Sequence, residues 1–230
     1  MSTTTTKNNN PIELNTEGPN ALEKVAMGYE QKKKMINTVL AVVVVAVAGY
    51  FGYKNFVVAP NEEKASIAMI TAEQYFAMDS VNLALNGDAR NSGFLKITKK
   101  FSGTSSANLA NYYAGICYLK MSDFKNAIKY LNDFDPAGTV LANAKNGLLG
   151  DAYMENNDLK KGIDSYKQAT SDKNDEVYTP IYLQRLAIAY EKNNQPDEAK
   201  KAYLRIRDEY PRSMQSRDVE KSLAKMGVLE

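Results

Sequence analysis

Apolar residues recur at helical spacing through most of the chain beyond residue 60, and this pattern predicts helices rather than strands. Residues 61–86 carry apolar side chains every three or four positions and allow a break near 79–80. A second helix over 94–103 follows a polar Asn-Gly-Asp turn. The two helices together predict a degenerate N-terminal helical hairpin over residues 61–107, which would cover one end of an all-helical fold.

Three tyrosines farther along the chain are each followed, nine positions later, by a small residue. They are Tyr118, Tyr153 and Tyr190, and their spacings of 153 − 118 = 35 and 190 − 153 = 37 are close to the period of about 34 of stacked helix-turn-helix repeats. Small residues also precede each tyrosine by three positions, and bulky residues follow it by thirteen. In chain order these sets are Ala127, Gly162 and Ala199, then Gly115, Gly150 and Ala187, then Leu131, Tyr166 and Tyr203. We expect the small residues where the two helices of a unit cross.

The turns inside these repeats carry local signals of their own. Asn157 and Asn194 fall where a first helix ends in a left-handed residue, a role that Asn fills when Gly is absent. Pro196 falls in the first turn of a second helix, where no intrahelical hydrogen bond is lost. Residues 108–213 therefore resemble three units of the tetratricopeptide repeat family. The resemblance implies an all-α fold, a tetratricopeptide-type α-solenoid.

The last segment, residues 214–230, repeats the helical pattern without a partner helix. Val219, Leu223 and Met226 form one apolar stripe, which predicts a C-terminal capping helix. Stacks of repeats need such terminal units, with a polar outer face, to stay soluble.

An uncharged apolar stretch at residues 35–53 is close to the roughly 20 residues that cross a bilayer as a helix. With the apolar patch that follows Lys54, it predicts a single N-terminal transmembrane helix over residues 35–58. A cleavable signal peptide is the rival interpretation, because Ala46-Val47-Ala48 fits a small-x-small cleavage site. The long segment that precedes the stretch favours the anchor.

Lysines before the apolar stretch predict its orientation. Lys32-Lys33-Lys34 stands directly before it, and excess positive charge keeps that flank in the cytoplasm. Residues 1–34 are then a cytoplasmic tail, disordered at least to Asn20, from which a short helix at 21–31 could lead into the span. The repeats would lie across a bacterial inner membrane, in the periplasm of a Gram-negative cell.

The composition argues against an enzyme. The chain has no His, so His-containing catalytic and metal sites are excluded, and its one cysteine, Cys117, is expected to be a buried thiol. Residues 172–176 carry several side chains with oxygen atoms, but they lack the spacing of a calcium-binding loop. A net charge of +2, with acids interleaved among the basic residues, predicts no nucleic-acid partner. We expect no cofactor and no metal.

The one candidate site is the groove that the first helices of tetratricopeptide units line. Relatives that grip acidic C-terminal tails place Lys, Asn and Arg there, whereas this chain offers apolar residues and two acids, with Arg185 beside them. An amphipathic helix or an extended apolar segment is the expected ligand, unless the capping helix fills the groove. The predicted lining comprises Leu109, Tyr112, Ile116, Leu119, Ala144, Gly147, Asp151, Met154, Ile181, Gln184, Ile188 and Glu191.

The chain resembles the YfgM-like family of bacterial inner-membrane proteins in the combination of a lysine-flanked span, a degenerate hairpin, three repeats and a capping helix. The resemblance implies an ancillary subunit of the secretory translocon, SecYEG, that works with a membrane-anchored periplasmic prolyl isomerase and receives unfolded clients. A scaffold for envelope assembly and an organelle import receptor with cytosol-facing repeats are the alternatives.

Overall fold

The structure is a computed structural model that describes residues 21–137 and 139–228, with side chains from Lys32 onward. The described residues form helices joined by turns and short irregular segments, with an isolated bridge between Gly87 and Ser92. The chain divides into two compact units at Lys54. Residues 1–20 of the predicted tail lie outside the described residues, and helix α1 (Ala21–Tyr53) begins within the rest of that tail.

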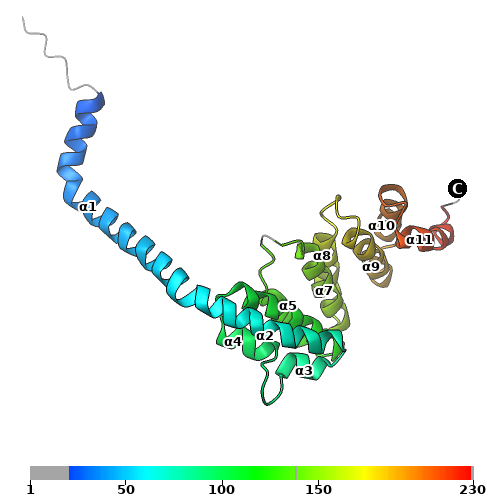
Figure 1. Cartoon of the computed structure of the whole chain (residues 1–230). Coiled ribbons are helices and arrows are strands. Elements are labelled where there is room, and N and C mark those ends of the chain that lie inside the picture. The colour runs from blue at the N-terminus through cyan, green and yellow to red at the C-terminus, as the bar shows by residue number, and fades with distance from the viewer. Residues whose placement is uncertain (1–20, 138, 229–230) are drawn as a thin grey trace, which may run out of the picture. The chain divides into compact units, whose positions relative to one another are not determined.

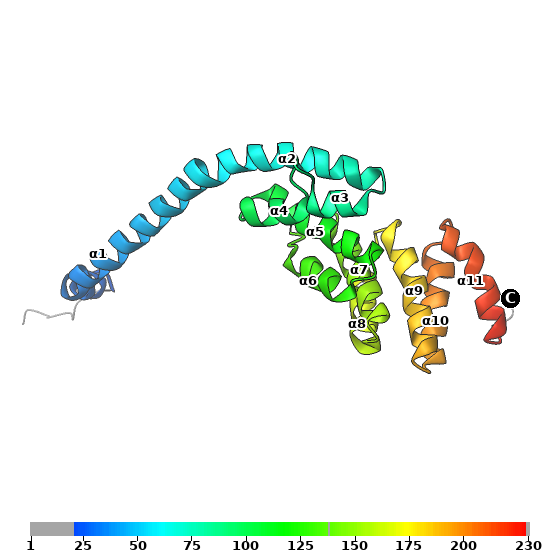
Figure 2. The ribbon, with the colours of Figure 1, turned by 90° about the horizontal axis from the view of Figure 1, so that it is seen from below.

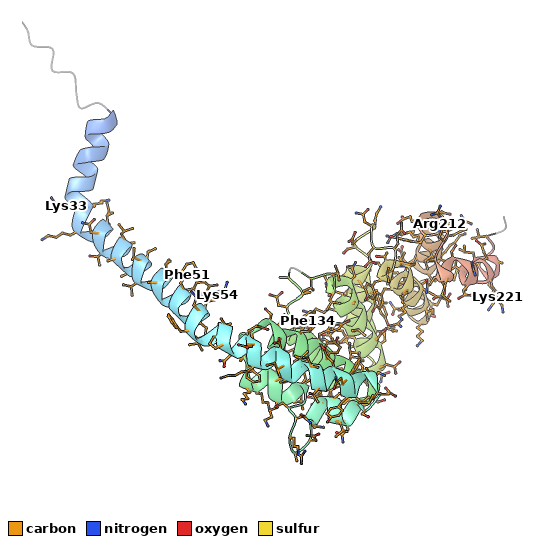
Figure 3. The ribbon with its side chains drawn as sticks, viewed as in Figure 1. Lys33, Phe51, Lys54, Phe134, Arg212 and Lys221 are labelled. Atoms are coloured by element: carbon orange, nitrogen blue, oxygen red, sulfur yellow. The ribbon has the colours of Figure 1, made fainter. Side chains whose placement is uncertain are left out.

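Helix α1 exposes its apolar side chains. Val45 is 70% exposed and Phe51 57%, and no part of its apolar window is buried in the protein. Lys33 precedes and Lys54 follows the apolar stretch, as labelled in Figure 3. A core helix of this composition would be covered by other elements. By length and composition α1 is therefore able to cross a membrane.

The second unit begins at Asn55, within the short π-helical segment η1 (Lys54–Val58), and continues with three helices. These are α2 (Ala59–Ala77), α3 (Val81–Asn86) and α4 (Phe94–Lys100), all visible in Figure 1. The break expected near residues 79–80 is present between α2 and α3. Glu62 of α2 accepts hydrogen bonds from the backbone N–H groups of Ser105 and Ser106, the unsatisfied donors at the start of the next helix. The N-terminal helices are thereby tied to the repeats.

Three helix pairs follow, in the register that the sequence predicts. They are α5 (Ser105–Lys120) with α6 (Phe124–Asp133), α7 (Ala142–Glu155) with α8 (Leu159–Ala169), and α9 (Tyr178–Lys192) with α10 (Pro196–Glu209). Each pair packs together, and each first helix also packs on the unit before it. Figure 2 shows α9, α10 and α11 (Met214–Lys225) running side by side at the C-terminal end.

Small residues lie where the register places them, at the crossing of the two helices. A Cβ on Gly115 would come within 2.6 Å of Leu131 Cγ, and one on Gly150 would overlap the ring of Tyr166. In the second unit a Cβ on Gly162 would meet Met154 Sδ at 2.6 Å. The bulky residue thirteen positions after the tyrosine therefore fills the space that the glycine leaves free within its own unit.

The turn between the helices of a unit is the same four times. Asn157 and Asn194 have φ of 60° and 54°, which confirms their predicted left-handed conformation, and Ser122 and Asp79 match them at 59° and 55°. In each turn the N–H group after the left-handed residue bonds back to a tyrosine carbonyl, a Schellman motif. The four tyrosines are Tyr75, Tyr118, Tyr153 and Tyr190.

The N-terminal hairpin is accordingly a fourth unit of the same design. Tyr75 is followed nine positions later by Ala84 and preceded at three by Ala72, both fully buried. Its second helix is split into α3 and α4 by a loop closed through Gly87 and Gly93, so Tyr75 and Tyr118 lie 118 − 75 = 43 residues apart instead of about 35. The sequence predicted the hairpin from its apolar spacing, but the longer spacing concealed the signature that it shares with the three repeats.

Helix α11 closes the other end. Val219 and Leu223 are buried against the last repeat, and Lys221 points to solvent (Figure 3). Helix α11 packs on α9 and α10 and contacts neither α5 nor α7. It extends the stack beyond α9 and α10, and it leaves α5 and α7 uncovered.

Candidate functional site

The surface formed by α5, α7 and α9, here called the inner surface, is the candidate binding site. Helix α7 packs on both α5 and α9, so residues of all three repeats share this surface. The predicted lining residues on α5 differ in role. Leu109 packs against the N-terminal core, whereas Ile116 and Leu119 are half-buried on the helix.

Buried aromatic rings support the tyrosines of α5 beneath the inner surface, since Phe94 and Phe134 are 0% and 1% exposed. The Tyr112 ring lies 5.1 Å from that of Phe134, and Tyr113 stacks on Phe94 with ring centroids 5.1 Å apart. Burial, with the phenol of Tyr178 as the next cause, raises the pKa of Tyr112 to about 12. Tyr112 is therefore a neutral hydrogen-bonding group on a half-exposed ring at neutral pH.

The predicted lining residues at the start of α7, in the second repeat, are covered by the third repeat. Ala144 and Gly147, predicted to line the groove, are buried, and a Cβ on Gly147 would overlap the ring of Tyr182 from the third repeat. The Tyr182 hydroxyl also donates a hydrogen bond of 3.5 Å to the Ala144 carbonyl oxygen. Glycine is needed at position 147 because an aromatic ring of the next unit lies directly on the α7 backbone.

Three predicted residues, Asp151, Met154 and Ile188, come together in one shallow pocket of ≈ 340 Å³ on the inner surface. Ile188 is 43% exposed, which leaves an apolar side chain open to a ligand. The pocket also holds both acidic and basic side chains. The other lining residues are Glu155, Tyr166, Arg185, Ala189 and Lys192.

Asp151 is the centre of a hydrogen-bonded chain in this pocket. The Tyr166 hydroxyl donates to Asp151 Oδ1 at 2.7 Å, and the Arg185 guanidinium donates to Oδ2. Arg185 also lies over the Tyr182 ring, 5.3 Å from its centroid. Burial and the adjacent Asp151 carboxylate raise the pKa of Tyr166 far above its usual value. Burial opposes the charge of Arg185, yet Asp151 raises the pKa of the guanidinium overall.

This ion pair was missed by the sequence interpretation, which placed Arg185 beside the groove and did not pair it with Asp151. The two residues are 34 positions apart, whereas the equivalent tyrosines of their units, Tyr153 and Tyr190, are 37 apart. Arg185 therefore lies about one helical turn before Ile188, the residue equivalent to Asp151, so the repeat spacing alone does not pair the two charges.

The remaining predicted residues lie elsewhere on α9. Ile181 packs against the C-terminal core, and Gln184 is half-buried. Glu191 lies next to Tyr203 of α10. Burial, and after it the Glu191 carboxylate, raises the pKa of Tyr203 to about 12. Glu191 is exposed, and it is not among the residues that line the pocket.

The other surfaces described by the structure have fewer features of a binding site. A pocket of ≈ 540 Å³ between α8, α9 and α10 is lined by charges that pair locally, such as Lys201 with Glu198 and Arg205 with Glu209. In the polar loop before α9, Asp175 accepts from the N–H groups of Val177 and Tyr178 and so begins the helix. No cluster of three metal-ligating side chains occurs in the part of the chain that the structure describes.

Comparisons with known proteins agree with this geometry. Tetratricopeptide repeat models match residues 109–134, 146–171 and 182–213, the three regular units. The chain therefore carries tetratricopeptide repeats, and its fold is a tetratricopeptide-type α-solenoid. Such repeats are protein–protein interaction modules and are generally not enzymes.

Solved structures with the same fold include proteins described as MamA. MamA residues 41 to the end from Desulfovibrio magneticus RS-1 align with a TM-score of 0.52 and 20% identity, covering 69% of this chain and 76% of that one. A crystal structure of MamA aligns over 90% of this chain and 96% of the other, with a TM-score of 0.50 and 19% identity. The comparison with curated proteins found no match.

Proposed function

We propose that this protein is a membrane-anchored interaction module whose inner surface binds a polypeptide segment of a partner. The observation that carries the proposal is the pocket of Asp151, Met154 and Ile188, which presents exposed apolar surface that the capping helix does not cover. Apolar surface left open on a repeat solenoid marks an interaction site. Its position across α7 and α9 lets one ligand contact two repeats.

Helix α1 supplies the proposed anchor. Its apolar residues have no protein cover, and Lys32-Lys33-Lys34 precedes them. The positive flank supports a cytoplasmic N-terminus and repeats on the periplasmic side of a bacterial inner membrane. With the resemblance to YfgM-like proteins, this arrangement supports an ancillary role at the secretory translocon, beside a membrane-anchored prolyl isomerase and with unfolded chains as clients.

Binding is tested with the full chain in lipid nanodiscs and fluorescent peptides of apolar sequence. Ile188→Ala and Tyr112→Ala should each weaken binding by about 1 to 2 kcal/mol if the residues are anchors. Ile67→Ala is the matched control, because Ile67 on α2 is 61% exposed and lies outside the inner surface. An equal loss of affinity in all three variants, or no loss in Ile188→Ala and Tyr112→Ala, would show that the peptide binds outside the inner surface.

Topology is tested separately, by adding protease to spheroplasts. Digestion of the repeats with survival of the N-terminal segment supports the periplasmic orientation. The reverse pattern favours an import receptor with cytosolic repeats. Co-purification with translocon subunits from gently solubilised membranes distinguishes the proposed role from an envelope scaffold.

A further inference from the structure

The inner surface presents hydrogen-bond donors that have no acceptor among the described residues. The hydroxyls of Tyr112 and Tyr178 and the amide of Gln184 make no hydrogen bond to another described residue. Arg185 uses one N–H group on Asp151, and its other guanidinium N–H groups have no acceptor in this part of the chain. All four side chains are partly exposed. They are available to a ligand that brings acceptors.

The charge of Arg185 is already neutralised. Asp151 accepts from Arg185 through one oxygen and from the Tyr166 hydroxyl through the other, so both partners are held in place. A ligand carboxylate on Arg185 would also approach the Asp151 carboxylate, and repulsion between like charges would offset the attraction. A neutral carbonyl oxygen meets no such repulsion.

We propose that the inner surface recognises an extended, uncharged apolar segment by its backbone carbonyls, with Arg185, Tyr112 and Tyr178 as donors and Asp151 as the residue that excludes carboxylates. This inference rests on the proposed function and names the ligand class of the same surface. Arg185 is the central donor, since it lies in the pocket beside Ile188. Tyr112 and Tyr178 extend the donor set along α5 and α9.

Only an extended segment offers what these donors need. In a helix the carbonyl groups, apart from the last four, accept hydrogen bonds from the helix itself. In an extended strand carbonyls remain available, and side chains alternate between two faces. One face of such a segment can place apolar side chains on Met154 and Ile188 while the backbone reaches Arg185.

The test uses three peptides of about ten residues on the full chain in nanodiscs. The first is a Val, Leu, Ser and Thr peptide with both ends blocked. The second is an equally apolar Ala and Leu peptide held helical by a hydrocarbon staple. The third is the first peptide with a free C-terminal carboxylate. We expect the blocked extended peptide to bind at least 10-fold more tightly than the stapled helix.

Variants assign the recognition to Arg185 and Asp151. Arg185→Gln should weaken the blocked extended peptide about 10-fold, because a charged donor is lost. Arg205→Gln is the matched control, since Arg205 pairs with Glu209 on α10, away from the inner surface. Asp151→Asn, which can keep an acceptor for Tyr166, should raise affinity for the carboxylate peptide about 10-fold relative to the blocked peptide. Circular dichroism melting identifies any variant that fails to fold.

The outcomes separate this inference from the function on which it rests. Equal binding of the stapled helix overturns the inference, as does an Arg185→Gln variant that binds normally while Ile188→Ala binds weakly. In both cases the inner surface remains a binding site with another ligand class. An unchanged carboxylate preference in Asp151→Asn overturns the exclusion role. Failure of all three peptides to bind contradicts the proposed function itself.

Discussion

The N-terminal unit and the three regular repeats share one turn and differ in the helix that follows it. In the regular repeats the second helix is continuous, whereas a loop through Gly87 and Gly93 divides it into α3 and α4 in the first unit. The turns of both classes end on a left-handed residue and bond back to a tyrosine carbonyl. The turn and its small-residue contacts therefore define the unit, while the second helix tolerates an insertion.

The two regions also differ in how they are packed. Buried residues of α2, α3 and α4 join those of α5 and Tyr130 in one core, and a second core runs from Ile163 to Leu223 through the last two repeats and the cap. Because a solenoid unit contacts only its neighbours, damage to one core should leave the other largely intact.

The largest expected effect comes from Gly93→Ala, in the loop that sets the first unit apart. A Cβ at Gly93 would overlap the backbone of Gly87 and Asn86, which cannot move aside as a flexible side chain can. We expect a loss of about 3 kcal/mol or more in the N-terminal core. Hydrogen exchange should accelerate in α3 and α4 and stay unchanged in α9 and α10. Gly49→Ala, which meets nothing within 4 Å, is the control.

Gly150→Leu should damage the regular repeats instead. The added side chain would overlap the ring of Tyr166, at a cost of about 1 to 3 kcal/mol or more. Thermal unfolding followed by circular dichroism should show a lower midpoint, and exchange should accelerate in α7 and α8. A variant that melts at the wild-type temperature would show that the repeat register is wrong.

The left-handed turns should respond alike in both regions. Asn157→Ala and Asp79→Ala should each cost roughly 1 kcal/mol, because Ala is strained where φ is positive. Asn157→Gly and Asp79→Gly should cost little, since Gly accepts this conformation. Denaturant unfolding measures all four. A penalty at Asn157 but none at Asp79 would separate the first unit from the others.

The smallest effect is a chemical probe of the N-terminal core. Cys117 is fully buried there, and burial raises the pKa of its thiol to about 12, in accord with the expected buried cysteine. Because the thiolate is the reactive form, a disulfide reagent at pH 8 should modify native protein very slowly. Since the raised pKa favours the neutral thiol in the folded state, stability should fall as pH rises from about 9 toward 12. Gly93→Ala should expose the thiol, and Gly150→Leu should leave it protected.

Much of the fold could be predicted because helical repeats encode their packing locally. The spacing of Tyr118, Tyr153 and Tyr190 with their small neighbours gave the register, and Asn157 and Asn194 identified the turns. The same signature at Tyr75, Ala72 and Ala84 was overlooked because the loop after Asn86 lengthens the period.

The candidate site was less predictable, because its contacts join separate units. Periodicity places Gly147 on the groove face, but only the stacking of α9 on α7 shows that Tyr182 covers it. The pairing of Arg185 with Asp151 likewise depends on the orientation of two side chains on neighbouring helices. Such contacts follow from the geometry of the stack, which a single chain pattern does not specify.

Site-specific photo-crosslinking shows directly whether the inner surface binds polypeptide segments. A benzophenone side chain placed at Ile188, in the full chain in its membrane, should form adducts with a blocked apolar peptide. The same group at Ile67, or at Lys201 on α10, should form few, because both positions are exposed outside the inner surface. Adducts that are equally abundant at all three positions, or that arise at Lys201 and not at Ile188, would contradict the account.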